Sequence, residues 1–137
     1  SLIRRVIEGE NPLIVWGNGT AVRDFIFSAD VAEAMIQVMQ KKIEKPINIG
    51  SGSGISIKEL VGTLISSKTI KKKPKVIFDK TKPAGDKMRI LDTSLAKSYR
   101  ITNNISLKEG LDKTINWYLN NQSLTKKRFN YFKKNNL

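Results

Sequence analysis

The sequence predicts an α/β fold, because segments with helical spacing of apolar residues alternate with short β-type segments. Three of the helical segments begin with a Ser or Asp that is followed three residues later by Glu, a pair that caps the first turn of a helix. Apolar residues make up 39% of the 137 residues, which suffices for a core and argues against wholesale disorder. The length is that of about one domain.

The amino-terminal part predicts a helix and two strands. Apolar residues at helical spacing favour a helix over 2–8, and Pro12 breaks that pattern. The segments 13–16 and 23–27 are rich in β-branched and aromatic residues, which is typical of strands. The segment 17–20 reads as a turn, since Asn and Gly tolerate positive φ. We therefore expect the two strands to pair as a hairpin.

Three longer helices follow. Their capping pairs are Asp30 with Glu33, Ser56 with Glu59, and Ser106 with Glu109. An apolar stripe at helical spacing continues each of them. In the first of these helices we expect Met35 and Met39 to lie in the core.

Short strands at 46–50 and 75–79 separate these helices, and a short helix near 93–99 precedes the last one. Past the last helix the periodicity fades. We therefore divide the chain into a folded region at 1–121 and a basic, partly aromatic tail at 122–137.

The composition excludes several classes of site. The sequence has no Cys and no His, which rules out disulfides, Cys/His zinc sites, thiol nucleophiles and Ser-His relays. No apolar run approaches the roughly 18 residues that span a bilayer, and no signal peptide is visible. We expect a soluble, cytoplasmic protein that does not bind membranes.

The net charge of +13 raises the alternative of a small nucleic-acid-binding module. The basic residues, however, form blocks between the predicted elements and in the tail, and only six of the 25 are Arg. Such blocks are typical of a solvated lysine-rich surface. We favour that interpretation over nucleic-acid binding.

A glycine cluster at 50–54 precedes the second long helix and suggests a dinucleotide-binding turn. The third glycine of the G-x-G-x-x-G fingerprint is replaced by Ile55, and Asp79 follows Gly50 by 29 residues, where about 20 are expected. We interpret the glycines as a flexible strand-to-helix turn and assign no cofactor-binding residue in this chain.

Several motifs in order carry a family resemblance. Residues 16–32 match W-G-x-G-x-x-x-R-[DE]-F-x-x-x-x-D-[VM]-A, and further matches lie at 47–52, 78–94 and 105–118. The chain thereby resembles, over residues 1 to about 121, the C-terminal portion of extended short-chain dehydrogenase/reductases. These are NAD(P)-dependent nucleotide-sugar epimerases, dehydratases and reductases, and the Trp and its spacing most resemble the GDP-L-fucose synthases.

The resemblance implies a small mixed α/β substrate-binding domain without the N-terminal Rossmann core of the family. The Y-x-x-x-K catalytic pair is absent as well, because the residues four positions after the tyrosines are Asn103, Gln122 and Asn135. We expect no catalytic residue here and no activity of this chain alone. NADP or NAD would serve the full-length enzyme and would not bind this chain by itself.

The resemblance also implies the site residues. Arg23 matches an Arg that contacts the diphosphate of a nucleoside-diphosphate sugar, Trp16 a substrate-contacting Trp, and Arg89 a second diphosphate-binding position where GDP-L-fucose synthases often have Lys. As residues alone, Arg23 could pair with a neighbouring Asp and Trp16 could lie in the core. Ala84 stands where GDP-L-fucose synthases can have Asp, which leaves the sugar open.

The resemblance finally implies a partner for one surface. In the family, the helix at 30–41 and the strand at 46–49 lie against the Rossmann half. Without that half their apolar faces would be exposed. We therefore expect self-association of this chain, or a homodimer of the full-length enzyme.

Overall fold

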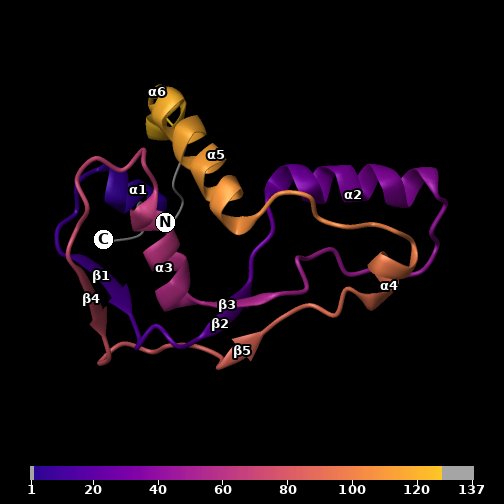
Figure 1. Cartoon of the computed structure of the whole chain (residues 1–137), viewed down its shortest axis with the longest axis horizontal. Coiled ribbons are helices and arrows are strands. Elements are labelled where there is room, and N and C mark those ends of the chain that lie inside the picture. The colour runs from indigo at the N-terminus through magenta and orange to yellow at the C-terminus, as the bar shows by residue number, and fades with distance from the viewer. Residues whose placement is uncertain (1, 128–137) are drawn as a thin grey trace, which may run out of the picture.

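The computed structural model describes residues 2–127 and has a mixed α/β fold (Figure 1). The helices are α1 (Leu2–Ile7), α2 (Ser28–Gln40), α3 (Ile57–Ser66), α4 (Ser94–Ser98), α5 (Leu107–Asn120) and α6 (Gln122–Lys127). The strands are β1 (Leu13–Trp16), β2 (Val22–Asp24), β3 (Gly54–Ser56), β4 (Val76–Asp79) and β5 (Met88–Arg89). The α1, α3, β1 and β4 elements lie at one end of the molecule, and α2 and α4 lie at the other.

The strands form two small sheets. In the first, β1 pairs with β4 in parallel, with Leu13 opposite Val76 and Trp16 opposite Asp79. In the second, β2 lies between β3, which is antiparallel to it, and β5, which is parallel. The expected strand at 75–79 is thus confirmed as β4.

The expected hairpin between the first two strands is wrong. The backbone groups between the two strands form hydrogen bonds with other elements. The Gly17 amide donates to the Asp79 carbonyl, and the Gly19 and Ala21 carbonyls accept from amides in the first turn of α3. The turn is therefore held by β4 and α3. After the turn the chain enters β2, which belongs to a different sheet from β1.

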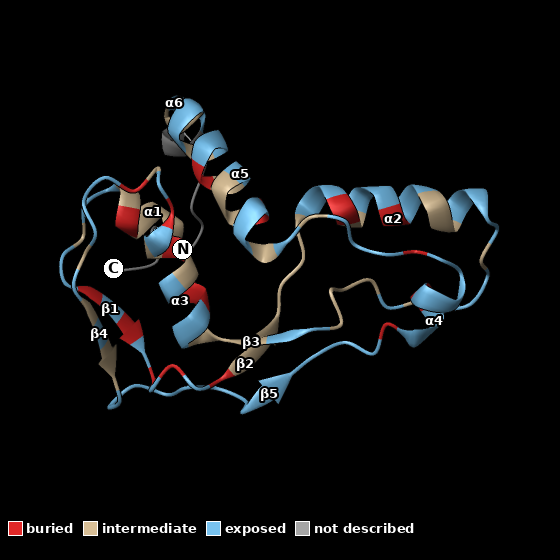
Figure 2. Cartoon of the chain, in the orientation of Figure 1, coloured by how far each residue is buried: buried red, intermediate tan, exposed pale blue. Residues whose placement is uncertain are grey.

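The main core lies between α1, α3, α5 and β1. It consists of Val6, Leu13, Val15, Val61, Leu64, Ile70 and Ile115. Leu13 and Ile115 are 0% exposed, and Figure 2 shows buried positions on α1, α3 and β1 at this end. Burial of this kind stabilises by roughly 1.5–3 kcal/mol per large apolar side chain.

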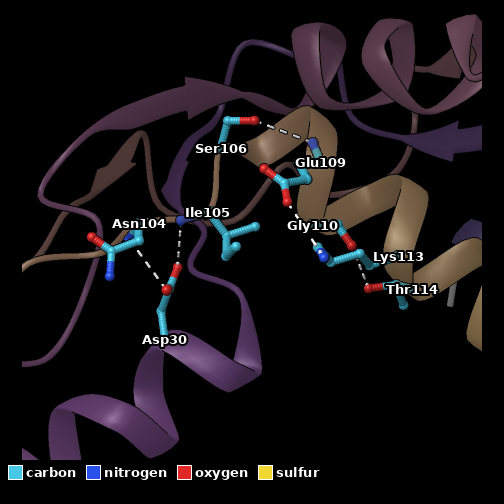
Figure 3. Close-up of polar contacts among 8 residues, drawn as sticks. All are labelled: Asp30, Asn104, Ile105, Ser106, Glu109, Gly110, Lys113 and Thr114. Carbon is cyan, nitrogen blue, oxygen red and sulfur yellow. Dashed lines mark hydrogen bonds and ion pairs between the residues drawn. The ribbon is translucent and has the colours of Figure 1, made fainter.

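Two of the three capping predictions hold. Ser56 and Glu59 form a full capping box, and the Ser106 hydroxyl accepts from the Glu109 amide at 3.2 Å. The prediction for Asp30 is wrong, because α2 begins two residues earlier, at Ser28. Instead, the buried Asp30 carboxylate accepts from the amides of Asn104 and Ile105 and holds the segment that leads into α5 (Figure 3).

A second, smaller core joins α2 to α4. Ala34, Ala96 and Ile101 are buried there, and Ile47 and Ile49 pack against them. The expected strand at 46–50 is wrong, because within the described residues this segment pairs with no strand and its isoleucines serve this core.

The expected burial of Met35 and Met39 is also wrong. These side chains are 57% and 76% exposed, because Ala34 and Val38 instead turn toward the second core. Figure 2 shows most of α2 exposed or half-buried. The exposed apolar face predicted for this helix is present in the structure, and it includes Ile36.

The first part of the predicted tail is helical. Residues 122–127 form α6, which contacts α5. The rest of the predicted tail, 128–137, lies outside the described residues. Among the helices at 2–127, none is long and apolar enough to cross a membrane.

Candidate functional site

Arg23 and Arg89 lie side by side on paired strands. Arg23 is on β2 and Arg89 on β5, and the parallel register places one directly opposite the other. Side chains in register on neighbouring strands leave the sheet on the same face. Two residues separated by 66 positions in the sequence therefore bring two guanidinium groups to one place.

The guanidinium of Arg23 is held by backbone oxygens. Its Nη1 donates to the Val22 carbonyl at 2.7 Å and to the Asp86 carbonyl at 2.8 Å. Within residues 2–127, its Nε and Nη2 donate to no acceptor, so one edge of the planar group keeps its donors. Such a fork binds two oxygens of a phosphate or carboxylate at once.

Arg23 is not paired with a neighbouring carboxylate. Asp24 and Asp30, the two candidates for such a pair, accept from backbone amides and from the Ser51 hydroxyl instead. The alternative of a purely structural ion pair for Arg23 is thus not what the structure has.

Arg89 forms an ion pair with the carboxylate of Asp86, three residues before it. Both side chains are largely exposed, at 74% for Arg89 and 59% for Asp86. Exposed pairs of this kind contribute roughly 0–1 kcal/mol and are screened by salt. Arg89 is therefore open to exchange its partner.

Trp16 ends β1 and is 64% exposed, so the core alternative for this residue is wrong. The ammonium of Lys82 lies 6.0 Å from the centre of its ring, at the outer limit for a cation–π contact. An indole exposed in this way offers an apolar face and an N–H donor to a ligand.

The loop 80–87 connects the three predicted residues. It carries Lys82 beside Trp16 and the Asp86 groups that Arg23 and Arg89 contact. Gly17 allows the loop to approach: it has φ +81°, and a Cβ there would lie 2.9 Å from the Cα of Ala84. The structure thus places Trp16, Arg23 and Arg89 around one loop.

Asp24 organises the glycine cluster. Its carboxylate accepts from the amides of Ser51, Gly52 and Leu91 at 2.9, 3.0 and 3.4 Å, and from the Ser51 hydroxyl. Partial burial raises the pKa of Asp24, but these hydrogen bonds outweigh it, so the pKa lies below its ordinary value.

This arrangement gives the glycines a structural role. The amides of Ser51 and Gly52 face an internal carboxylate, and a Cβ at Gly50 would lie 2.8 Å from Asp24 Oδ2. The cluster 50–54 therefore does not fit a dinucleotide pyrophosphate, because the amides that would bind it are already bonded to Asp24. Asp24 follows Arg23 directly in the motif, but its hydrogen bonds to the glycine cluster were not predicted from the sequence.

An apolar cleft of about 460 Å³ opens between α1, α3 and α5. Its lining includes Phe25, Phe27, Leu60 and Leu107, with Ser28 and Thr114 among the few polar groups. Neither arginine lines it, so it adds no charged group to the site. Among residues 2–127, no cluster of Asp and Glu could hold a metal ion.

Comparison with known proteins identifies relatives of this chain. A family model described as the NAD dependent epimerase/dehydratase family matches residues 1–50. A putative GDP-L-fucose synthase 2 of Arabidopsis thaliana is 36% identical over 126 residues, which is 88% of this chain and 38% of that protein. The GDP-L-fucose synthase of Escherichia coli K12 is 35% identical over 120 residues, 80% of this chain and 37% of that protein.

Solved structures show the same fold. UDP-glucose 4-epimerase of Thermotoga maritima, with UDP-glucose, matches 88% of this chain and 38% of its own with a TM-score of 0.70 and 28% identity. UDP-glucuronic acid 4-epimerase of Bacillus cereus, with UDP-glucuronic acid and NAD, matches 87% of this chain and 38% of its own with a TM-score of 0.73 and 28% identity.

By sequence and by fold the chain thus resembles part of the NAD-dependent epimerase/dehydratase family: its residues 1–50 match the family model, and its mixed α/β fold matches a portion of the solved epimerases. It spans about 38% of the length of these relatives. Within the family it is similar to the GDP-L-fucose synthases. The resemblance drawn from the sequence motifs is confirmed.

Proposed function

We propose that this chain is the nucleotide-sugar-binding portion of an NAD(P)-dependent epimerase/reductase of the GDP-L-fucose synthase type. The observation that carries the proposal is the register of β2 and β5, which sets Arg23 opposite Arg89 on one face. Two guanidinium groups that have N–H donors available for a ligand suit the two phosphates of a nucleoside diphosphate.

Each proposed site residue has its own task. Arg23, anchored through Nη1, presents Nε and Nη2 as a preset fork to one phosphate. Arg89 serves the other phosphate by exchanging Asp86 for the ligand. Trp16, beside the same loop, packs against the sugar or the base.

The chemistry of the full-length enzyme would come from its nicotinamide cofactor, which transfers hydride when bound. The glycine cluster of this chain is bonded to Asp24 and does not serve that cofactor. We therefore propose that NAD or NADP binds a Rossmann portion of the full-length enzyme and that this chain holds the substrate against it. The greater length of the relatives supports this division.

The exposed face of α2 fits the same proposal. Met35, Ile36 and Met39 form an apolar surface that a soluble monomer rarely leaves open. We propose that the cofactor-binding portion of the full-length enzyme covers it, and that in this chain alone the face drives self-association.

The test is calorimetric titration of the 137-residue chain with inorganic pyrophosphate, GDP, UDP and a GDP-sugar. Arg23→Ala should weaken the binding of every ligand by roughly 10- to 100-fold, since a hydrogen bond to a charged group contributes about 1.5–3 kcal/mol. The matched control is Lys113→Ala, which removes one exposed cation of α5, a helix that lies apart from β2 and β5 (Figure 1). A folded wild-type chain that binds none of these ligands at millimolar concentration would refute the proposal.

The alternatives separate in the same experiment. Preference for UDP over GDP would assign the chain to another nucleotide-sugar enzyme of the family, a question that Ala84 leaves open. Equal loss of binding in Arg23→Ala and Lys113→Ala would indicate a general effect of positive charge, as for a nucleic-acid surface.

A further inference from the structure

Asp86 contacts both arginines of the proposed site, and it does so with different groups. Its backbone carbonyl accepts from Arg23 Nη1 at 2.8 Å. Its side-chain carboxylate pairs with Arg89 Nη2. One residue thus fixes the first guanidinium through the main chain and neutralises the second through the side chain.

We infer that the Asp86 carboxylate is an internal anion that occupies Arg89 until a diphosphate displaces it, and so sets the affinity of the site. This inference rests on the proposed function, because it assigns Arg89 to the ligand. The carboxylate satisfies the same donors that a phosphate would use.

The exposure of the pair makes this exchange feasible. Arg89 and Asp86 are 74% and 59% exposed, so the carboxylate returns to water at little cost when it leaves the arginine. Gly85, with φ +72°, precedes Asp86, and Lys87 follows it, so no bulky apolar side chain flanks the carboxylate in sequence. A diphosphate carries more negative charge than one carboxylate and can also contact Arg23, so it wins the competition.

The division between main chain and side chain gives a selective perturbation. Asp86→Asn removes the competing charge and keeps the carbonyl that anchors Arg23. A competitor in an exposed pair contributes about 0.2–1 kcal/mol, so its removal should tighten binding roughly 1.5- to 5-fold. A carboxylate that instead helped to hold the ligand would produce weaker binding when replaced.

The experiment titrates the full chain with inorganic pyrophosphate at low ionic strength, with calorimetry as the readout. The variants are wild type, Asp86→Asn, Arg89→Ala and the double variant of these two. Glu33→Gln is the control, because Glu33 is an exposed carboxylate that bonds Gln37 within α2, so its loss makes the same change in net charge. Far-UV circular dichroism checks that each variant is folded.

We expect Asp86→Asn to bind pyrophosphate more tightly than the wild type and Glu33→Gln to bind it equally well. In the double variant, Asp86→Asn should add nothing to the effect of Arg89→Ala. The inference is overturned if Asp86→Asn leaves binding unchanged or weakens it while the wild type still binds pyrophosphate. It is also overturned if Glu33→Gln gives the same gain, or if the gain survives in the Arg89→Ala background. If no variant binds pyrophosphate while the wild type still binds a GDP-sugar, the inference is overturned and the proposed function stands. If the wild type binds neither these ligands nor GDP or UDP, the proposed function itself fails.

Discussion

Replacing Asp24 by Asn should destabilise the fold and loosen the site at once. The carboxylate accepts four hydrogen bonds: Oδ1 takes the Ser51 amide and hydroxyl, and Oδ2 takes the amides of Gly52 and Leu91. An Asn side chain keeps one acceptor oxygen and turns an NH2 group toward donors on the other side. A partly buried donor left without its acceptor costs about 1–3 kcal/mol, so we expect a loss of about 2 kcal/mol at pH 7.

The pH dependence of the wild type provides an independent check. The folded pKa of Asp24 is depressed, so its contribution is complete above the unfolded pKa of about 3.9 and is lost as the pH falls through the folded value. The difference in unfolding free energy between wild type and Asp24→Asn should therefore shrink below about pH 4. Urea denaturation at pH 7 and at a pH below 4, followed by circular dichroism, measures it.

Asp92→Asn is the control for this prediction. Asp92 is exposed and the pKa of its carboxylate is also lowered, first by its hydrogen bond with Ser94, but among the described residues this carboxylate accepts only within its own turn. The Asp92 backbone carbonyl, which the variant keeps, accepts from Asn48. Its replacement should change stability far less. Equal losses in the two variants, or a loss in Asp24→Asn that is the same at both pH values, would refute the assignment of Asp24 as the group that ties the glycine cluster to β2.

Three further perturbations test other parts of the structure. Gly17→Ala should lower the free energy of unfolding by about 1–3 kcal/mol in urea denaturation and weaken pyrophosphate binding, because φ is positive at Gly17 and its added Cβ would clash with the Cα of Ala84. The control Gly62→Ala, in open space on α3, should raise the free energy of unfolding slightly. Arg23→Lys should bind pyrophosphate nearly as poorly as Arg23→Ala in titration, because a point charge does not replace the fork; binding equal to wild type would contradict this. Met39→Ser should shift the chain toward monomer in sedimentation velocity, whereas a wild type that is already monomeric at high concentration would contradict self-association.

Local chemistry predicted the helices well. The capping box of Ser56 and Glu59 is a signal four residues long, and it places the start of α3 correctly. The pair of Asp30 and Glu33 has the same spacing and misleads, because a carboxylate can cap its own helix or bond elsewhere. Here Asp30 accepts from amides 74 and 75 residues away, a contact that no local pattern encodes.

Strand pairing was not predictable in the same way. The segments of β1 and β2 have strand character, yet they do not pair with each other: β1 pairs with β4, beyond α3, and β2 pairs with β3, just before α3, and with β5, beyond it. A short turn with two glycines normally indicates a hairpin. Here its amides and carbonyls bond to β4 and α3, and only the tertiary structure reveals that competition.

The site shows the same limits. Motif matching predicted Trp16, Arg23 and Arg89 separately, and the structure gathers them around the loop 80–87. Motif matching did not predict the roles of Asp24 or Asp86. The sequence shows that each carboxylate lies near an arginine, but it does not show which donors the carboxylate accepts from or which arginine it contacts. Exposed apolar groups were also misassigned, since the spacing of Met35 and Met39 on a helix cannot show whether a partner is present.

The net charge of +13 and the arginine pair act on different scales. The lysine blocks raise the local concentration of any polyanion, a long-range effect that salt screens within about 10 Å at 0.1 M. In the proposed site the arginine pair acts at contact, through two planar guanidinium groups that the β2–β5 register places on neighbouring strands. Selection of a diphosphate over other anions must come from contact with the arginine pair, because long-range attraction by the lysines does not depend on the shape of the anion. In the function proposed for this chain, the placement of two arginines by a strand register, rather than the excess of positive charge, is therefore the feature that a nucleotide-sugar ligand recognises.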